Sequence, residues 1–237
     1  MISATLGRST NTIREQVIRT TRTFAMQSSA PKRLPLFGPP RAWRTEEWTA
    51  SDDRVRGGSS QSYLEPSSDL IKATFRGHLD TQTLGGAGFA SQRTTSTDKT
   101  WDVSPYDGIE LILARGDGKR YTLVIKTDLP AKRPDGRDES TVSYEYTFLA
   151  HDSKEEQVIF IPWDAFKPYY RGKPKNDAAE LDLKAIKRWS FMCRSFFAEQ
   201  EGDFKVVIMT VQAVLNSSKR SSVDPIRICG GSLCSMM

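Results

Sequence analysis

Histidine and cysteine are scarce in this chain of 237 residues, which contains two histidines and three cysteines. Neither His78 nor His151 lies in an H-E-x-x-H motif, and no Gly-x-Ser-x-Gly turn is present, so the signatures of zinc proteases and serine hydrolases are missing. Cys193, Cys229 and Cys234 are too few and too unevenly spaced for a disulfide framework, and Cys229 and Cys234 have no further His or Cys nearby. The sequence therefore predicts no catalytic residue, no cofactor and no metal site.

Long hydrophobic runs are also missing. No apolar stretch approaches the ~20 residues that a membrane-spanning helix requires, so at most a peripheral association with a membrane is expected. The glycine-rich segment Gly85-Gly86-Ala87-Gly88 is not followed by Lys-Ser or Lys-Thr, and it runs into a strand-like segment that begins at Phe89. A phosphate loop needs a helix N-terminus at that point, so a tight connection between strands is predicted instead.

Acidic residues are numerous, and the adjacent pair Asp52-Asp53 raises the alternative of a glycoside hydrolase. That chemistry requires two carboxyl groups about 5 to 10 Å apart on opposite sides of a sugar. Aspartates in turns usually accept hydrogen bonds from nearby backbone amides, and this structural interpretation is favoured here. An enzymatic role is therefore not predicted.

Positive charge is concentrated at the amino terminus. The net charge is +5, but residues 1–44 contain eight basic residues and one acid, Glu15, so the remainder carries a net charge of −2. A near-neutral body lacks the clustered positive surface that phosphate binding needs, and nucleic-acid binding is not predicted. The first 30 residues are rich in Arg, Ser and Thr, a pattern typical of a mitochondrial transit peptide, with a disordered basic tail as the alternative.

Composition divides the chain into three parts. Residues 1–35 form a basic arm that ends in a segment rich in Ser, Pro and Gly, which disfavours regular structure. Residues 36–216 are predicted to form one folded domain, and residues 217–237 a disordered tail. Trp43 and Trp48 are expected to pack the start of the domain against its core.

Alternation of apolar and polar residues is the main signal within the predicted domain. It recurs in four segments: 71–75, 109–113, 121–125 and 142–148. A period of two is typical of strands with one buried face, and Asp-Gly and Gly-Asp-Gly sequences between the segments favour tight turns. Two longer apolar runs, 158–161 and 204–215, add further strands. The pattern predicts an all-β sandwich.

Helix is predicted only for two short segments, residues 181–188 and 163–166. Between them lies a basic and aromatic loop, residues 167–175. Tyrosine and arginine are enriched at binding hot spots, so this loop is the candidate partner-binding surface, and a solvated connection is the alternative. Its candidate residues are Tyr169, Tyr170, Arg171 and Lys173.

Several phrases in order along residues 43 to 215 resemble the complex I intermediate-associated protein 30 family. They are Trp48 with Ser51-Asp52-Asp53 and Gly57-Gly58-Ser59; Phe75-Arg76-Gly77; Gly88-Phe89-Ala90-Ser91; Tyr106-Asp107-Gly108-Ile109; Gly116-Asp117-Gly118 with Tyr121; Ile161-Pro162-Trp163 with Phe166 and Pro168; Arg171-Gly172; and Gly202-Asp203-Phe204. The resemblance implies a galactose-binding-like jelly-roll β-sandwich.

The same resemblance implies a function. Members of this family act as non-enzymatic, chaperone-like assembly factors of mitochondrial NADH:ubiquinone oxidoreductase, complex I. The expected partners are other complex I assembly factors and membrane-arm intermediates, and the expected location is the matrix side of the inner membrane, with the cytoplasm as the alternative. A carbohydrate- or ligand-binding module outside the respiratory chain is the alternative function, because exposed tyrosines such as Tyr169 and Tyr170 can stack on sugars.

Overall fold

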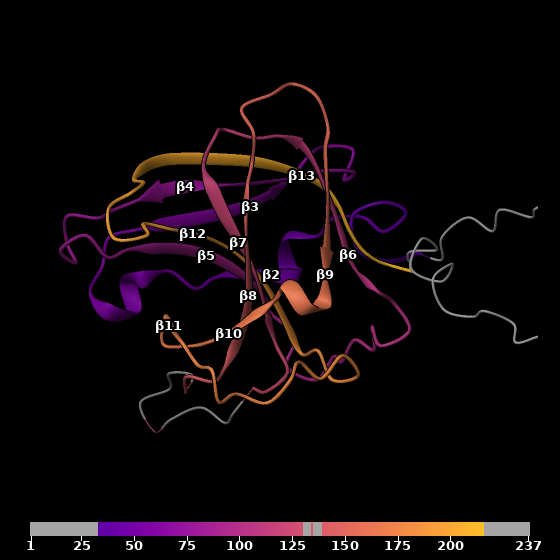
Figure 1. The fold of residues 1–237 in the computed structure, drawn as a ribbon. Helices are drawn as coiled ribbons and strands as arrows, with labels where there is room; N and C mark the ends of the chain where they lie inside the picture. Colours follow the sequence, from indigo (N-terminus) through magenta and orange to yellow (C-terminus); the bar gives the residue numbers. More distant parts are fainter. Residues whose placement is uncertain (1–32, 130–133, 135–138, 216–237) are drawn as a thin grey trace, which may run out of the picture. The chain divides into compact units, whose positions relative to one another are not determined.

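Two antiparallel sheets face each other in the computed structural model, which describes residues 33–129, 134 and 139–215 (Figure 1). The first sheet has the order β3 (Gln61–Pro66), β4 (Ala73–Leu79), β13 (Gly202–Val214), β6 (Gly108–Arg115) and β9 (Gln157–Pro162), with β1 (Arg33–Phe37) also paired to β13. The second has the order β11 (Lys173–Pro174), β10 (Lys167–Tyr170), β8 (Ser143–Leu149), β7 (Arg120–Lys126), β12 (Arg188–Arg194), β5 (Phe89–Thr94) and β2 (Trp48–Ala50). The predicted all-β sandwich is confirmed.

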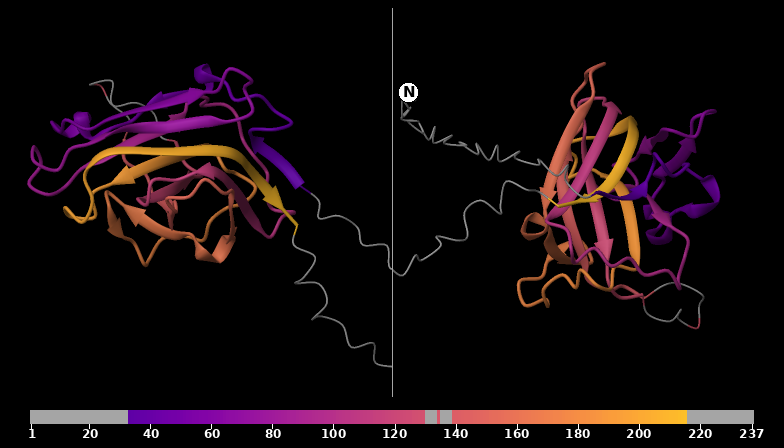
Figure 2. Two further views of the ribbon diagram at one scale, coloured as in Figure 1. Left: turned by 90° about the horizontal axis from the view of Figure 1, so that it is seen from above. Right: turned by 90° about the vertical axis from the view of Figure 1, so that its right-hand side faces the viewer.

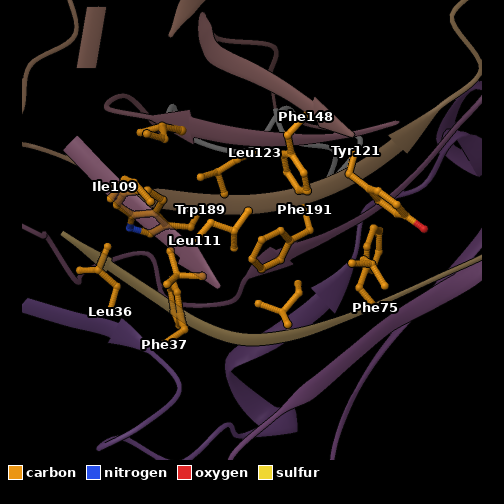
Figure 3. Close-up of a cluster of buried hydrophobic side chains, with 14 of the residues drawn as sticks. Leu36, Phe37, Phe75, Ile109, Leu111, Tyr121, Leu123, Phe148, Trp189 and Phe191 are labelled. Atoms are coloured by element: carbon orange, nitrogen blue, oxygen red, sulfur yellow. The ribbon is translucent and has the colours of Figure 1, made fainter. Parts of the chain in front are cut away.

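The predicted alternation identifies the inner face of β6 and β7 correctly, whereas Ile71 of the predicted segment 71–75 precedes β4 and is 43% exposed. Ile109, Leu111 and Leu113 of β6 are buried, as are Leu123 and Ile125 of β7. Figure 3 shows side chains of the two sheets pointing toward one another. Apolar residues at every second position thus fill the space between the layers, which is the packing expected of a sandwich.

Aromatic rings occupy one part of this core. Phe37 lies with ring centroids 4.9 Å from Trp48, 5.9 Å from Trp43 and 6.4 Å from Trp189. The indole nitrogen of Trp43 donates to the backbone oxygen of Met209 at 3.0 Å. The predicted packing of Trp43 and Trp48 against the core is confirmed, since both are buried.

Strand β13 runs along the middle of the first sheet and bends on the way. Its pairing register with β6 shifts between Val207 and Ile208 and again between Ile208 and Thr210. Such irregularities increase the local twist of a strand, which allows β13 to follow the curved sheet seen in Figure 2. The strand pairs with β1, which begins at Arg33, before the predicted domain start at residue 36.

The helix predicted for residues 181–188 is wrong. The backbone amides of Trp101 and Val103 donate to the carbonyls of Ile186 and Leu183, and Ile186 is buried. These backbone carbonyls therefore accept hydrogen bonds from residues 101 and 103, where in a helix they would accept them from residues within the same segment. The other predicted turn is confirmed as η3 (Trp163–Ala165), a single 3-10 turn, and two more occur at η1 (Thr45–Glu47) and η2 (Asp53–Arg56).

Within the described residues, no helix has the length and apolar character needed to span a membrane. The predicted transit peptide and the predicted tail at residues 217–237 lie outside the described residues.

Candidate partner-binding face

The four predicted site residues lie on the hairpin of β10 and β11 at one edge of the second sheet (Figure 1). Tyr169 pairs with Ser143 of β8. Arg171 takes a left-handed φ of 50° at the tip, and its guanidinium carbon lies 5.4 Å from the ring centroid of Tyr170. Lys173 is exposed on β11.

The hairpin does not gather these residues into one site. Tyr170 lines a cleft of about 440 Å³ together with Thr141, Val142 and Lys175. Tyr169 instead lies beside Arg194, whose guanidinium carbon is 5.4 Å from the tyrosine ring centroid. Tyr169 therefore contacts the outer face of the second sheet, whereas Tyr170 lines the cleft.

Arg194 is the central residue of that outer face. It ends β12, yet its Nη1 donates to Glu145 Oε2 of β8 at 2.8 Å. Because β7 lies between those strands, the arginine side chain reaches across it. Thr122 of β7 has no exposed surface, although the strand alternation directs it to the outer face.

The ion pair between Arg194 and Glu145 is largely removed from water. The side chains are 19% and 7% exposed, and Ser143 Oγ donates to the other carboxylate oxygen, Glu145 Oε1, at 2.8 Å. Desolvation offsets much of the attraction in such a pair, so its main effect is to fix both side chains in one arrangement. Arg194 Nε is buried and has no hydrogen-bond partner in the part of the chain that the structure describes.

Phe196 continues this arrangement toward the end of the sheet. Its ring centroid lies 4.9 Å from the guanidinium carbon of Arg194 and 4.0 Å from that of Arg120. Arg120 also forms an ion pair with Glu199. Tyr169, Arg194, Phe196 and Arg120 thus form an alternating series of rings and guanidinium groups, called here the arginine–aromatic row.

The turn that carries Phe196 has an unusual backbone. Phe196, Phe197 and Ala198 all have positive φ, at 48°, 61° and 67°. Left-handed backbone costs a non-glycine residue roughly 1–2 kcal/mol. Phe197 is 89% exposed.

Comparisons with known proteins agree with this architecture. The model of the Complex I intermediate-associated protein 30 family matches residues 36–208. The chain belongs to this family. A relative in Schizosaccharomyces pombe, named "Uncharacterized protein C9E9.15", is 43% identical over 216 residues, which cover 85% of this chain and 98% of the relative.

Two solved structures of a family 11 carbohydrate-binding module from Clostridium thermocellum have the same fold as this family member. One, a module of the cellulase Lic26A-Cel5E, has a TM-score of 0.50 and covers 78% of this chain and 96% of its own. The other, in complex with a mixed-linked tetrasaccharide, has a TM-score of 0.51 and covers 79% and 98%. Both are 16% identical to this chain, so the similarity concerns the fold alone.

Asp52 and Asp53, which belong to a segment that carries the family resemblance, have a structural role in the sandwich. Asp53 is fully buried, and its carboxylate accepts from Ser60 Oγ at 2.7 Å, Ser60 N at 3.1 Å and Phe89 N at 3.0 Å. Asp52 accepts from Ser62 Oγ at 2.6 Å and from Ser91 N at 2.8 Å. The two carboxylates therefore connect the start of β3 to β5 through backbone and hydroxyl donors, which agrees with the structural interpretation.

Gly58 is required at its position because the Asp53 carboxylate lies directly against it. A Cβ on Gly58 would lie 2.4 Å from the Asp53 carboxylate carbon, a distance that no side chain can adopt. The chain therefore approaches the Asp53 side chain closely at this glycine.

The remaining reactive groups of this family member do not form a catalytic set in the described ranges. His78 Nδ1 lies 2.7 Å from Asp203 Oδ1 beside a shallow cleft of about 460 Å³ on the outer face of the first sheet. Burial raises the pKa of Cys193 to about 12, which keeps the thiol protonated and unreactive. In the same ranges, no three His, Cys, Asp or Glu side chains are grouped to hold a metal ion.

Sequence reasoning missed Arg194, Glu145 and Phe196. For Glu145, the sequence showed only that it lies in the alternating segment 142–148. A signal for the turn was present, because Phe196-Phe197 lies between two apolar strands and precedes the polar segment Glu199-Gln200-Glu201. Two consecutive phenylalanines in a connection between strands are uncommon, since connections are usually solvated.

Proposed function

We propose that this protein is a non-catalytic assembly factor of mitochondrial complex I and that the arginine–aromatic row is the surface with which it binds partner proteins. Membership of the family supports a role related to complex I assembly. The row supports the mode of action, because arginine and tyrosine are the residue types enriched at binding hot spots.

The observation that carries the proposal is the fixed position of Arg194. Glu145 accepts a hydrogen bond from its guanidinium at 2.8 Å, and the ring centroids of Tyr169 and Phe196 lie 5.4 and 4.9 Å from its guanidinium carbon. A side chain that is already ordered loses little conformational entropy when a partner binds. The expected partners are other assembly factors and membrane-arm intermediates of complex I, on the matrix side of the inner membrane.

The rings at this edge favour a protein partner over a sugar. A sugar-binding platform needs an open aromatic face, but a face of Tyr169 is next to Arg194 and a face of Tyr170 is next to Arg171. The carbohydrate-binding alternative predicts binding on a glycan array by the wild-type protein and loss of that binding in Tyr170→Ala. Such a result would contradict the proposal.

The decisive experiment is deletion of the gene in the organism of origin, followed by native gel electrophoresis of mitochondrial membranes. Assembled complex I is expected to fall, and wild-type protein is expected to restore it. Arg194→Ala is expected to restore it poorly, whereas Arg171→Ala, an exposed arginine outside the row, should restore it fully. Normal complex I in the deletion strain would contradict the assembly role.

A further inference from the structure

Strand β9 is an open edge of the first sheet. It lies at the end of the strand order and pairs only with β6. Every second residue of an edge strand directs its backbone N–H and C=O groups away from the sheet. Among the described residues, no segment other than β6 forms a hydrogen bond with the backbone of residues 157–161. The outward backbone groups of β9 are therefore available to another extended chain.

The other edge strands are protected against such pairing. At β3, the backbone amide of Ser62 donates to Asp52 Oδ2 at 3.2 Å, so a side chain already occupies a group that a new strand would need. Strand β1 includes Arg33 and Pro35, while β2 and β11 have only three and two residues. Covered amides, charged residues, prolines and short strands are common means of preventing association between sheet edges.

Strand β9 has none of these features before its last residue, Pro162. Residues 157–161 read Gln-Val-Ile-Phe-Ile, an uncharged segment of residue types that favour strands. Ile161 is fully buried on the core side, whereas Val158 on the outer side is 58% exposed. Leu149, whose carbonyl accepts from Gln157 Nε2 at 2.9 Å, is 43% exposed beside it. An exposed, uncharged edge of this kind is a template for a further strand.

We propose that β9 pairs in antiparallel orientation with β9 of a second copy of this chain, so that the first sheets of two protomers form one continuous sheet. The added segment must be extended over about six residues to match the backbone groups of β9. It must also be uncharged where it lies beside Val158 and Phe160, since these side chains offer no partner for a charge. Among the edge strands that the structure describes, β9 alone meets both conditions, and a two-fold axis places it against itself.

The same geometry predicts a closed dimer. A two-fold axis perpendicular to the sheet keeps the outer faces of both protomers on one side, so Val158 and Phe160 of each copy lie next to the other copy across the axis. Both β9 edges are then used. The remaining edges of the joined sheet are those of β3 and β1, which are protected, so association stops at two chains.

The first test measures the mass of the full chain in solution by sedimentation equilibrium. A species with the mass of two chains is expected, in reversible equilibrium with the monomer. A monomer at every accessible concentration, or an open series of larger species, would overturn the proposal.

The second test places a charge on β9. Val158→Lys and Val158→Glu should each raise the Kd of the dimer by about tenfold or more, because either charge is repelled by its own copy across the axis. Tyr63→Lys, at a 46% exposed position on β3, is the matched control and should change Kd less than about twofold. Circular dichroism and Tm confirm that each variant is folded. Weakening by only one of the two charges, or by Tyr63→Lys, would contradict self-pairing of β9.

Hydrogen exchange locates the interface independently of any substitution. The β9 amides that point away from β6 should exchange more slowly as the concentration of the wild-type protein increases, and this dependence should be lost in Val158→Lys. A dimer without such protection would have its interface elsewhere and would refute the proposal. Protection that appears only when another protein is added would assign the edge to that protein and would also refute it.

The dimer does not depend on the proposed role in complex I assembly, and the two proposals fail separately. Normal complex I in the deletion strain, combined with a dimer that Val158→Lys dissociates, would reject the assembly role and retain the β9 interface. Loss of complex I in the deletion strain, combined with a monomeric wild-type protein, would do the reverse.

Discussion

Arg194 reaches across β7 to donate a hydrogen bond to Glu145 at 2.8 Å, and the carboxylate side chain is only 7% exposed. Two strands that are not neighbours in the sheet are thus connected by one side chain on the outer face. The pair on the other sheet, Arg76 with Glu65, is 43% and 50% exposed and provides a natural comparison.

Glu145→Ala is expected to lower the free energy of unfolding by about 3 kcal/mol, because it leaves Arg194 as a mostly buried charge without its carboxylate. Glu65→Ala should cost no more than about 1 kcal/mol, since water screens an exposed pair. Urea denaturation of both variants measures the difference. Equal losses would mean that the Arg194 pair behaves like an ordinary surface pair.

Asp53→Ala should destabilise the domain by about 2–4 kcal/mol, because three donors on Ser60 and Phe89 lose their buried acceptor. Asp203, whose side chain is 92% exposed, supplies the control, and Asp203→Ala should change stability by less than about 0.5 kcal/mol. Thermal melts followed by circular dichroism test both. A stable Asp53→Ala protein with altered activity toward glycosides would instead revive the hydrolase alternative.

Cys193 should resist alkylation in the folded protein. Burial raises the pKa of its thiol from 9.0 to about 12, so little thiolate is present at pH 8. Because the folded-state pKa is raised, the stabilising effect of the neutral thiol is complete below pH 9 and is lost as the pH rises toward about 12. Iodoacetamide labelling of a Cys229→Ser and Cys234→Ser variant, with and without urea, isolates this thiol. Rapid labelling without urea would contradict the buried position.

Charge reversal at the hairpin tip separates the predicted loop from the arginine–aromatic row. Arg171→Glu combined with Lys173→Glu should leave stability within about 0.5 kcal/mol of the wild type, since both side chains are exposed. Capture of the partner by the tagged protein should fall strongly for Arg194→Ala and only slightly for the double variant. If the double variant loses capture and Arg194→Ala keeps it, the hairpin tip is the binding surface.

Local patterns in the sequence predicted the strands but not every connection. Ile109, Leu111 and Leu113 alternate with polar residues, and this period of two is a property of the strand itself. The segment 181–188 also has a pattern compatible with helix, yet the carbonyls of Leu183 and Ile186 bond to the backbone at Val103 and Trp101. Its conformation depends on pairing with a segment about 80 residues earlier in the chain. The local pattern of apolar residues contains no information about such a pairing.

The candidate site was predicted in part for a similar reason. Tyr169 was identified from its residue type and from the basic loop around it. Its partner Arg194 belongs to β12, and nothing in the local sequence at either residue refers to the other.

The sequence alone determined that this protein is an all-β sandwich with a buried aromatic core and no recognisable catalytic motif, because apolar alternation, turn glycines and residue composition are local properties. The tertiary structure decided which outer-face residues meet. The strand order β10, β8, β7, β12 brings Tyr169, Glu145 and Arg194 together, and the Gln200 side chain donates hydrogen bonds to the backbone oxygens of Arg120 and Arg194. Strand order is set by long-range pairing, so only the folded chain reveals it.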